Sequence, residues 1–229
     1  MPDFSKLELT PPVAILASGV LVAGAIIFTN YYTPERLPPV AAGQGGALSI
    51  RPPSEGDHWR GSREASIILV EFSDFECPFC ASIHPTLSRI VEESEGGVAW
   101  VYRHFPLESI HSQARPAAIA SECVAELLGN DAFWAFADRV FSERRALGSA
   151  YYTQVASELG ADGAAFSACV ALARHDAAVT EDLNEALGSG GQGTPFTIVV
   201  AGDTQTSFSG ALPYTQIKAV ISAVENRQR

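Results

Sequence analysis

The first pattern along the chain is a long apolar run near the N-terminus. No charged residue occurs from Leu9 to Pro34, and the stretch from Val13 to Phe28 is apolar apart from one serine and two glycines. A helix of about 20 apolar residues crosses a bilayer, so we predict a transmembrane anchor over residues 12–32. A cleaved signal peptide and a buried core helix are the alternatives, but no small-x-small cleavage site follows Phe28 directly, and the run is long for a signal peptide.

A segment rich in proline and glycine follows the apolar run, from Thr33 to Ser62. This composition is typical of linkers. We therefore expect residues 33–62 to form a tether with little packed structure, in which Ala47–Ile50 is a candidate for one short edge strand. The folded domain is then expected at residues 63–229, and residues 1–11 form a short segment before the anchor.

Within residues 63–229, strand-like and helix-like patterns alternate. A β-branched and aromatic run starts at Ile67 and stops at Cys77, and a helical pattern begins near Ala81. From His111 to Gly188, apolar residues recur at helical spacing. The other expected elements are strands at Val98–Phe105, Phe196–Ala201 and Thr206–Ser209 and a last helix at Pro213–Asn226. The pattern predicts an α/β domain with an all-helical insertion at about residues 111–188.

Composition narrows the class of partner. The chain has 229 residues, a net charge of −11 and an isoelectric point near 4.8. This acidity argues against nucleic acid as a partner and against a polybasic membrane patch. Four cysteines are compatible with an oxidising compartment.

The chemistry is concentrated in Cys77-Pro78-Phe79-Cys80, at the expected junction of strand and helix. Two cysteines at this spacing at a helix start can form a small disulfide ring, and the free N–H groups and helix dipole favour a thiolate on the first sulfur. Pro78 suits the first helical turn, where a missing N–H costs nothing. Because Cys-x-x-Cys is also half of many zinc sites, a second signal has to decide between these readings.

That signal is Gly193-Thr194-Pro195-Phe196, which opens a later apolar strand. With this pair of motifs the sequence resembles the thioredoxin superfamily, and in particular the DsbA-like thiol:disulfide oxidoreductases of bacterial envelopes. The resemblance covers roughly residues 57–225 and implies a thioredoxin-like fold, with a central mixed sheet flanked by helices. It also implies that Thr194-Pro195 is a cis-proline loop facing the cysteines, where backbone pairs with an extended substrate.

Disulfide exchange needs an attacking thiolate and a second thiol that resolves the mixed disulfide. Cys77 suits the first role, and Cys80, one turn into the helix, suits the second. The resemblance gives Glu71 the place of a buried acid that exchanges a proton with the second cysteine; the alternative is a strand glutamate facing water. Asp74 and Glu76 are expected at the surface of the active-site rim, where their charge would oppose thiolate formation.

Two positions depart from DsbA itself. Phe79 stands where DsbA has histidine, and phenylalanine cannot stabilise a thiolate by charge or hydrogen bond, so we expect Cys77 to be less acidic and the domain less oxidising. Thr194 stands where DsbA has valine, and threonine is frequent in reducing and isomerising relatives. The direction of electron flow therefore remains open at this point.

The remaining candidates are Cys123 and Cys169, on apolar faces of the insertion helices. They are either free core thiols or a structural disulfide, which some DsbA-like proteins have in the helical domain, and we favour the disulfide. No two of the five histidines have metal-ligand spacing, so we expect no metal site and no cofactor.

The resemblance implies a function: an extracytoplasmic oxidoreductase, anchored in the cell membrane by one helix, that forms disulfides in exported proteins. Residues 1–11 are then expected to be a short cytoplasmic N-terminus. Its partners would be exported protein thiols and a membrane redox protein, either a quinone-linked reoxidant or a donor of reductant. Alternatives are a disulfide reductase or isomerase of the same fold and, from another class, a thioredoxin-fold copper-binding module. Copper-carrying relatives usually space their cysteines by three, and here methionine is present only as the initiator.

Overall fold

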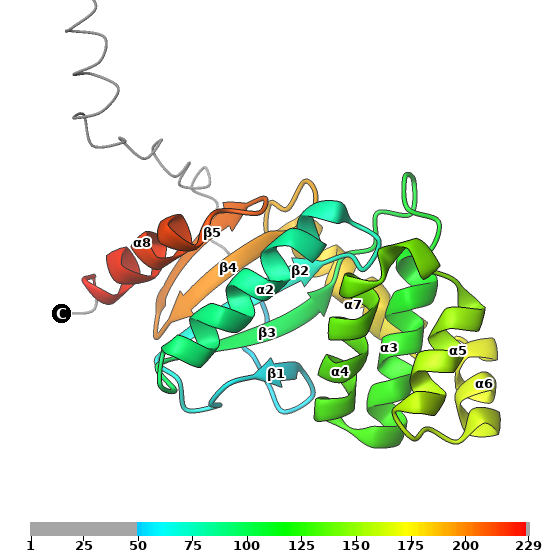
Figure 1. The fold of residues 1–229 in the computed structure, drawn as a ribbon. Helices are drawn as coiled ribbons and strands as arrows, with labels where there is room; N and C mark the ends of the chain where they lie inside the picture. The colour runs from blue at the N-terminus through cyan, green and yellow to red at the C-terminus, as the bar shows by residue number, and fades with distance from the viewer. Residues whose placement is uncertain (1–49, 228–229) are drawn as a thin grey trace, which may run out of the picture. The chain divides into compact units, whose positions relative to one another are not determined.

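The structure, a computed structural model, describes residues 50–227. These residues contain one mixed sheet with the strand order β1-β3-β2-β4-β5 (Figure 1). The central strand β2 runs parallel to its neighbour β3, and every other neighbouring pair is antiparallel. The strand bounds are β1 His58–Arg60, β2 Ile67–Ser73, β3 Val98–His104, β4 Phe196–Ala201 and β5 Thr204–Ser209. The predicted α/β class and the mixed sheet are confirmed.

Helices cover both faces of the sheet. The helices α2 (Pro78–Glu93) and α8 (Tyr214–Glu225) pack on one face, and α7 (Asp176–Gly188) packs on the other (Figure 1). The alternation of β2 separates the two cores, because successive side chains of a strand point to opposite faces. Ile67 and Leu69 belong to the core under α2, while Val70 and Phe72 belong to the core under α7.

The predicted helical insertion lies between β3 and β4. It consists of α3 (Ala114–Leu128), α4 (Asn130–Ser142), a 3₁₀ turn at Arg144–Ala146, α5 (Ser149–Glu158), α6 (Gly163–Ala171) and then α7. Its helices pack on one another, and α4 also contacts α2 and β1 (Figure 1). The insertion therefore shares the core of the sheet domain on the α2 side.

The anchor expected at residues 12–32 and the N-terminal segment at 1–11 lie outside the described residues. Among residues 50–227, no helix has the length and apolar character needed to cross a membrane. The candidate strand at Ala47–Ile50 also falls outside the described part, except for Ile50, which is buried but not in a strand.

The expected linker at residues 33–62 is wrong in its described part. Residues 50–62 pack on the sheet, β1 lies within them as an edge strand, and Trp59 is buried. One of the contacts that hold this segment is an ion pair that local composition does not reveal: Asp57 accepts hydrogen bonds of 2.8 and 3.2 Å from the buried guanidinium of Arg103 on β3. A buried charge without a partner is costly, so this contact fixes the segment to the domain.

Candidate active site

Cys77 stands at the junction of β2 and α2. It is the N-cap residue of α2, Pro78 occupies the first turn, and the Cys77 carbonyl accepts a helical hydrogen bond from the N–H of Ala81 (3.1 Å). The free N–H groups of a first helical turn point toward the N-terminus of the helix. The sulfur of Cys77 therefore lies in the positive end of the helix dipole.

This position makes Cys77 acidic. A hydrogen bond from the Cys80 thiol, the side chain of Thr194 and the backbone N–H groups of Cys80 and Phe79 lower the pKa of Cys77 to about 5, although burial opposes the shift. Phe79 contributes only its backbone, because its side chain points to solvent and is 62 % exposed. The thiolate at neutral pH is thus stabilised without an ionic partner from the position between the two cysteines.

Cys80 differs from Cys77 because its pKa is raised. Its side chain is fully buried, and burial, the hydrogen bond with Cys77 and the charge of Glu71 raise its pKa well above the ordinary value. The N–H of Asp74 lies 3.4 Å from its sulfur. Both cysteines are free thiols in the structure, and Cys77 itself keeps only 3 % of its surface. Acidity, more than exposure, therefore distinguishes the two sulfurs.

The loop before β4 covers Cys77. The Thr194-Pro195 bond is cis, as expected, and the carbonyl oxygen of Thr194 lies 3.4 Å from the Cys77 sulfur. The Thr194 hydroxyl is buried and acts on the same sulfur, where it helps to lower the pKa of Cys77. The site thus places a backbone carbonyl and a hydroxyl beside the acidic sulfur.

Glu71 lies behind the cysteines on β2. It is 1 % exposed, so the alternative of a glutamate facing water is wrong. Burial raises its pKa to about 8, against a 2.8 Å hydrogen bond donated by the Ser73 hydroxyl and an interaction with the Trp100 indole. At neutral pH this carboxyl is therefore mainly protonated, and its interaction with Cys80 places a proton near the second sulfur.

Asp74 is not the surface residue that we expected at the rim. It is buried, and its carboxylate accepts hydrogen bonds from the N–H groups of Glu76 (2.8 Å) and Leu107 (2.9 Å) and pairs with His111 (2.8 Å). Glu76 is half-buried and accepts a 2.6 Å hydrogen bond from the N–H of Gln113. Both acids therefore hold the loop between β3 and α3 against the active site, and local sequence gave no sign of these long-range contacts.

Two polar side chains beside Glu71 have no signal in the sequence. In the strand register, Glu71 lies directly opposite Tyr102 of β3 on one side and Thr197 of β4 on the other. The Tyr102 hydroxyl, the Thr197 hydroxyl and one oxygen of Glu71 are buried without a hydrogen-bond partner among residues 50–227. Only the register across three strands brings these groups into one row, and periodicity alone does not determine it.

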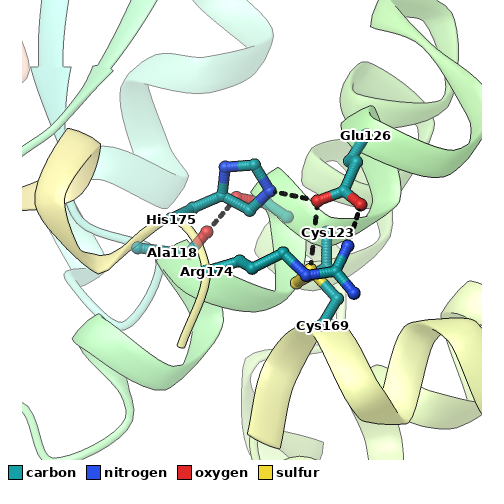
Figure 2. Close-up of a disulfide and its surroundings, with 7 residues drawn as sticks. Ala118, Cys123, Glu126, Cys169, Arg174 and His175 are labelled. Atoms are coloured by element: carbon teal, nitrogen blue, oxygen red, sulfur yellow. Dashed lines mark hydrogen bonds and ion pairs between the residues drawn. A yellow bond between two sulfur atoms is a disulfide. The ribbon is translucent and has the colours of Figure 1, made fainter. Parts of the chain in front are cut away.

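The two remaining cysteines are joined. A disulfide links Cys123 of α3 to Cys169 of α6, as the sequence favoured, and both residues are fully buried. Figure 2 shows Glu126 above this bridge, paired with Arg174 and His175. The disulfide ties two helices of the insertion together.

Comparisons with known proteins agree with this fold. A sequence model of the family described as Thioredoxin matches residues 53–223. Among solved structures, Pseudomonas aeruginosa DsbA2 is 26 % identical with a TM-score of 0.60, covering 75 % of this chain and 95 % of that one. Wolbachia pipientis alpha-DsbA1 is 19 % identical with a TM-score of 0.66, covering 76 % and 94 %, and shows the shared fold.

A curated relative carries a different name. The Na(+)/H(+) antiporter NhaA 3 of Salinispora tropica is 34 % identical over 139 residues, which is 61 % of this chain and 21 % of that protein. The chain thus spans about a fifth of the length of this relative. The name of the antiporter describes a much longer protein.

Proposed function

The chain belongs to the thioredoxin family, with a DsbA-like fold, and from this premise we propose that it is a thiol:disulfide oxidoreductase that forms disulfides in exported proteins. The observation that carries the proposal is the asymmetric pair of sulfurs: an acidic Cys77 at a helix N-terminus and a buried Cys80 of high pKa, beside the cis Thr194-Pro195 loop.

The reaction starts with Cys77 and Cys80 joined in a disulfide. A substrate thiolate attacks the Cys77 sulfur, the bond between Cys77 and Cys80 breaks, and Cys80 leaves as a thiolate that takes the proton of Glu71. A second substrate thiolate then attacks the substrate sulfur of the mixed disulfide, and Cys77 leaves. The substrate loses two electrons and gains a disulfide, and the enzyme ends with a Cys77 thiolate and a Cys80 thiol.

The low pKa of Cys77 favours the oxidation of substrate thiols. A thiol of low pKa is a good leaving group, and an enzyme whose reduced form is stabilised in this way is a stronger oxidant. The alternative is a reductase or isomerase, which uses the same groups in the reverse reaction. Thr194 supports that alternative, whereas the pKa values of the two cysteines support the oxidase. The reduction potential separates the two: a value toward about −120 mV indicates an oxidase, and one toward about −270 mV indicates a reductase.

A trapping experiment tests the roles of the two cysteines. We expect the Cys80→Ser variant to accumulate a mixed disulfide with an unfolded model protein that contains a disulfide. The Cys77 thiolate attacks one sulfur of that disulfide, the other sulfur leaves as a thiolate, and the mixed disulfide persists because the resolving thiol is absent. The Cys77→Ser variant, which is the matched control, should form none. Equal accumulation in both variants, or none in either, would contradict the assignment of Cys77 as the exchanging sulfur.

We further propose that the domain works outside the cytoplasm, tethered by residues 12–32, with exported protein thiols as substrates and a quinone-linked membrane protein as its reoxidant. The apolar run supports the tether, and the Cys123–Cys169 disulfide is typical of an oxidising compartment. The topology is tested by fusing, after Arg229, a reporter enzyme that becomes active only after export. The cells that express the fusion are then fractionated to locate the protein. An inactive fusion, or a wholly cytosolic protein, would overturn it.

A further inference from the structure

Three potential metal ligands converge from three separate elements of the fold. His58 lies on β1, His104 ends β3, and Glu122 lies on α3. The Nε2 atoms of the two histidines lie 2.7 and 2.8 Å from the same oxygen, Oε1 of Glu122. The three candidate ligand atoms all lie within 4.8 Å of one another.

The strand register explains why the two histidines meet. β1 pairs antiparallel with β3, and His58 lies opposite Tyr102. His104 is two residues beyond Tyr102, so both imidazoles stand on the same face of neighbouring strands. The residue numbers 58, 104 and 122 have no motif spacing, which is why the sequence gave no sign of the cluster.

The surroundings hold the rings in place. The His58 ring stacks on Phe133 at 3.6 Å between centroids with an interplanar angle of 4°, and the His104 ring makes an edge contact with Tyr102 at 5.3 Å. The backbone N–H of His104 also donates a 2.8 Å hydrogen bond to the carboxylate of Asp182. Ligands held by packing in this way need little rearrangement to bind a metal ion.

The cluster is enclosed, and its residual exposure lies at His58 and Glu122. The side chains of His58, His104 and Glu122 are 11 %, 2 % and 16 % exposed. A zinc ion at about 2.0–2.2 Å from each ligand places tetrahedral ligand atoms roughly 3.3 Å apart. The observed separations of 2.7 and 2.8 Å therefore have to widen by only about half an ångström.

We propose that His58, His104 and Glu122 form a zinc-binding site, with water as the fourth ligand. Two imidazoles and one carboxylate are a common ligand set for zinc. The ion would replace the hydrogen bonds between the histidines and Glu122 and would link the edge strand β1 to helix α3. It would thereby stabilise the attachment of the insertion to the sheet.

A second cluster in the described part of the chain does not qualify as a zinc site. Cys123, Cys169 and His175 also lie close together, but the two sulfurs are joined in a disulfide and offer no thiolate. His175 and Glu126 form a single histidine–carboxylate pair at 2.8 Å (Figure 2). That pair lacks the second imidazole and serves as a matched control.

The test is a Zn²⁺ titration of the full-length chain against a chromophoric chelator. Cys77 and Cys80 are first oxidised to the disulfide, so that their sulfurs do not bind zinc. We expect one tightly bound ion per chain, at least roughly 10-fold weaker binding in Glu122→Gln and in His58→Asn, and unchanged binding in His175→Asn.

X-ray absorption at the zinc edge of the wild-type protein gives a result that does not depend on the folding of a variant. We expect nitrogen and oxygen donors with the multiple scattering of imidazole and no sulfur. Absence of binding at micromolar zinc, equal affinity in Glu122→Gln and the wild type, or sulfur in the ligand set would overturn the proposal. The three side chains would then form only a hydrogen-bonded cluster.

Discussion

Replacement of Glu71 by glutamine should change how the stability of the domain depends on pH. Burial raises the pKa of this carboxyl to about 8 in the folded protein, whereas its reference value of 4.5 applies to the unfolded chain. The folded state therefore binds the proton more tightly. The resulting stability is fully present below pH 4.5 and is lost as the pH rises toward 8.

The pKa shift of Glu71 sets the size of its effect on the free energy of unfolding. Each pKa unit corresponds to about 1.4 kcal/mol, so the carboxylate lowers the free energy of unfolding by about 3 kcal/mol at pH 7 and by only about 1 kcal/mol at pH 5. Glutamine keeps the shape of the side chain without a charge to bury. The free energy of unfolding of the variant, measured relative to that of the wild type, should therefore rise by about 2 kcal/mol between pH 5 and pH 7.

The assay is urea unfolding of both proteins at a series of pH values. The Cys77–Cys80 pair is kept reduced and the Cys123–Cys169 disulfide intact, which mass analysis after alkylation can verify. Glu64→Gln, at an exposed glutamate, is the matched control and should run parallel to the wild type. If the Glu71→Gln curve also runs parallel between pH 5 and 8, the carboxyl is not desolvated, and its role as the proton donor to Cys80 fails.

Three further predictions concern the cysteines and their neighbours. Phe79→His should raise the reduction potential measured in glutathione buffers, because an exposed side chain gains a charge that stabilises the thiolate of Cys77; an unchanged or lower value would contradict this reasoning. Cys80→Ala should raise the pKa of Cys77 above about 5, because the largest of the interactions that lower it is the Cys80 hydrogen bond, and the ultraviolet absorbance of the thiolate reports this titration. Replacing Cys123 and Cys169 together by alanine should lower the free energy of unfolding by about 4 kcal/mol in the chain-entropy model, since the bridge spans a sequence separation of 46, and urea unfolding of the double variant tests the value.

The sequence by itself determined the features that depend on neighbouring residues. Strand, turn and helix around Cys77 follow from a β-branched run, a proline in the first turn and the periodicity after it. The helical insertion follows from apolar spacing over a long stretch. These signals are local, and the structure has the corresponding elements close to the predicted residues.

Tertiary structure alone decided the features that join distant parts of the chain. Residues 50–62 have the composition of a linker, yet Asp57 pairs with Arg103 and fixes them to the sheet. Asp74 looks like a surface acid and instead accepts hydrogen bonds from a loop more than thirty residues away.

The row of Glu71, Tyr102 and Thr197 and the meeting of His58, His104 and Glu122 have the same origin. Both depend on strand register and helix packing, which a one-residue shift would abolish. Hydrophobic pattern specifies which face of an element is buried, but the partners of a buried polar group are set only when the elements are packed together. The sequence therefore located the reactive cysteines and, through the family resemblance, Glu71, and the fold decided which other polar groups lie beside them.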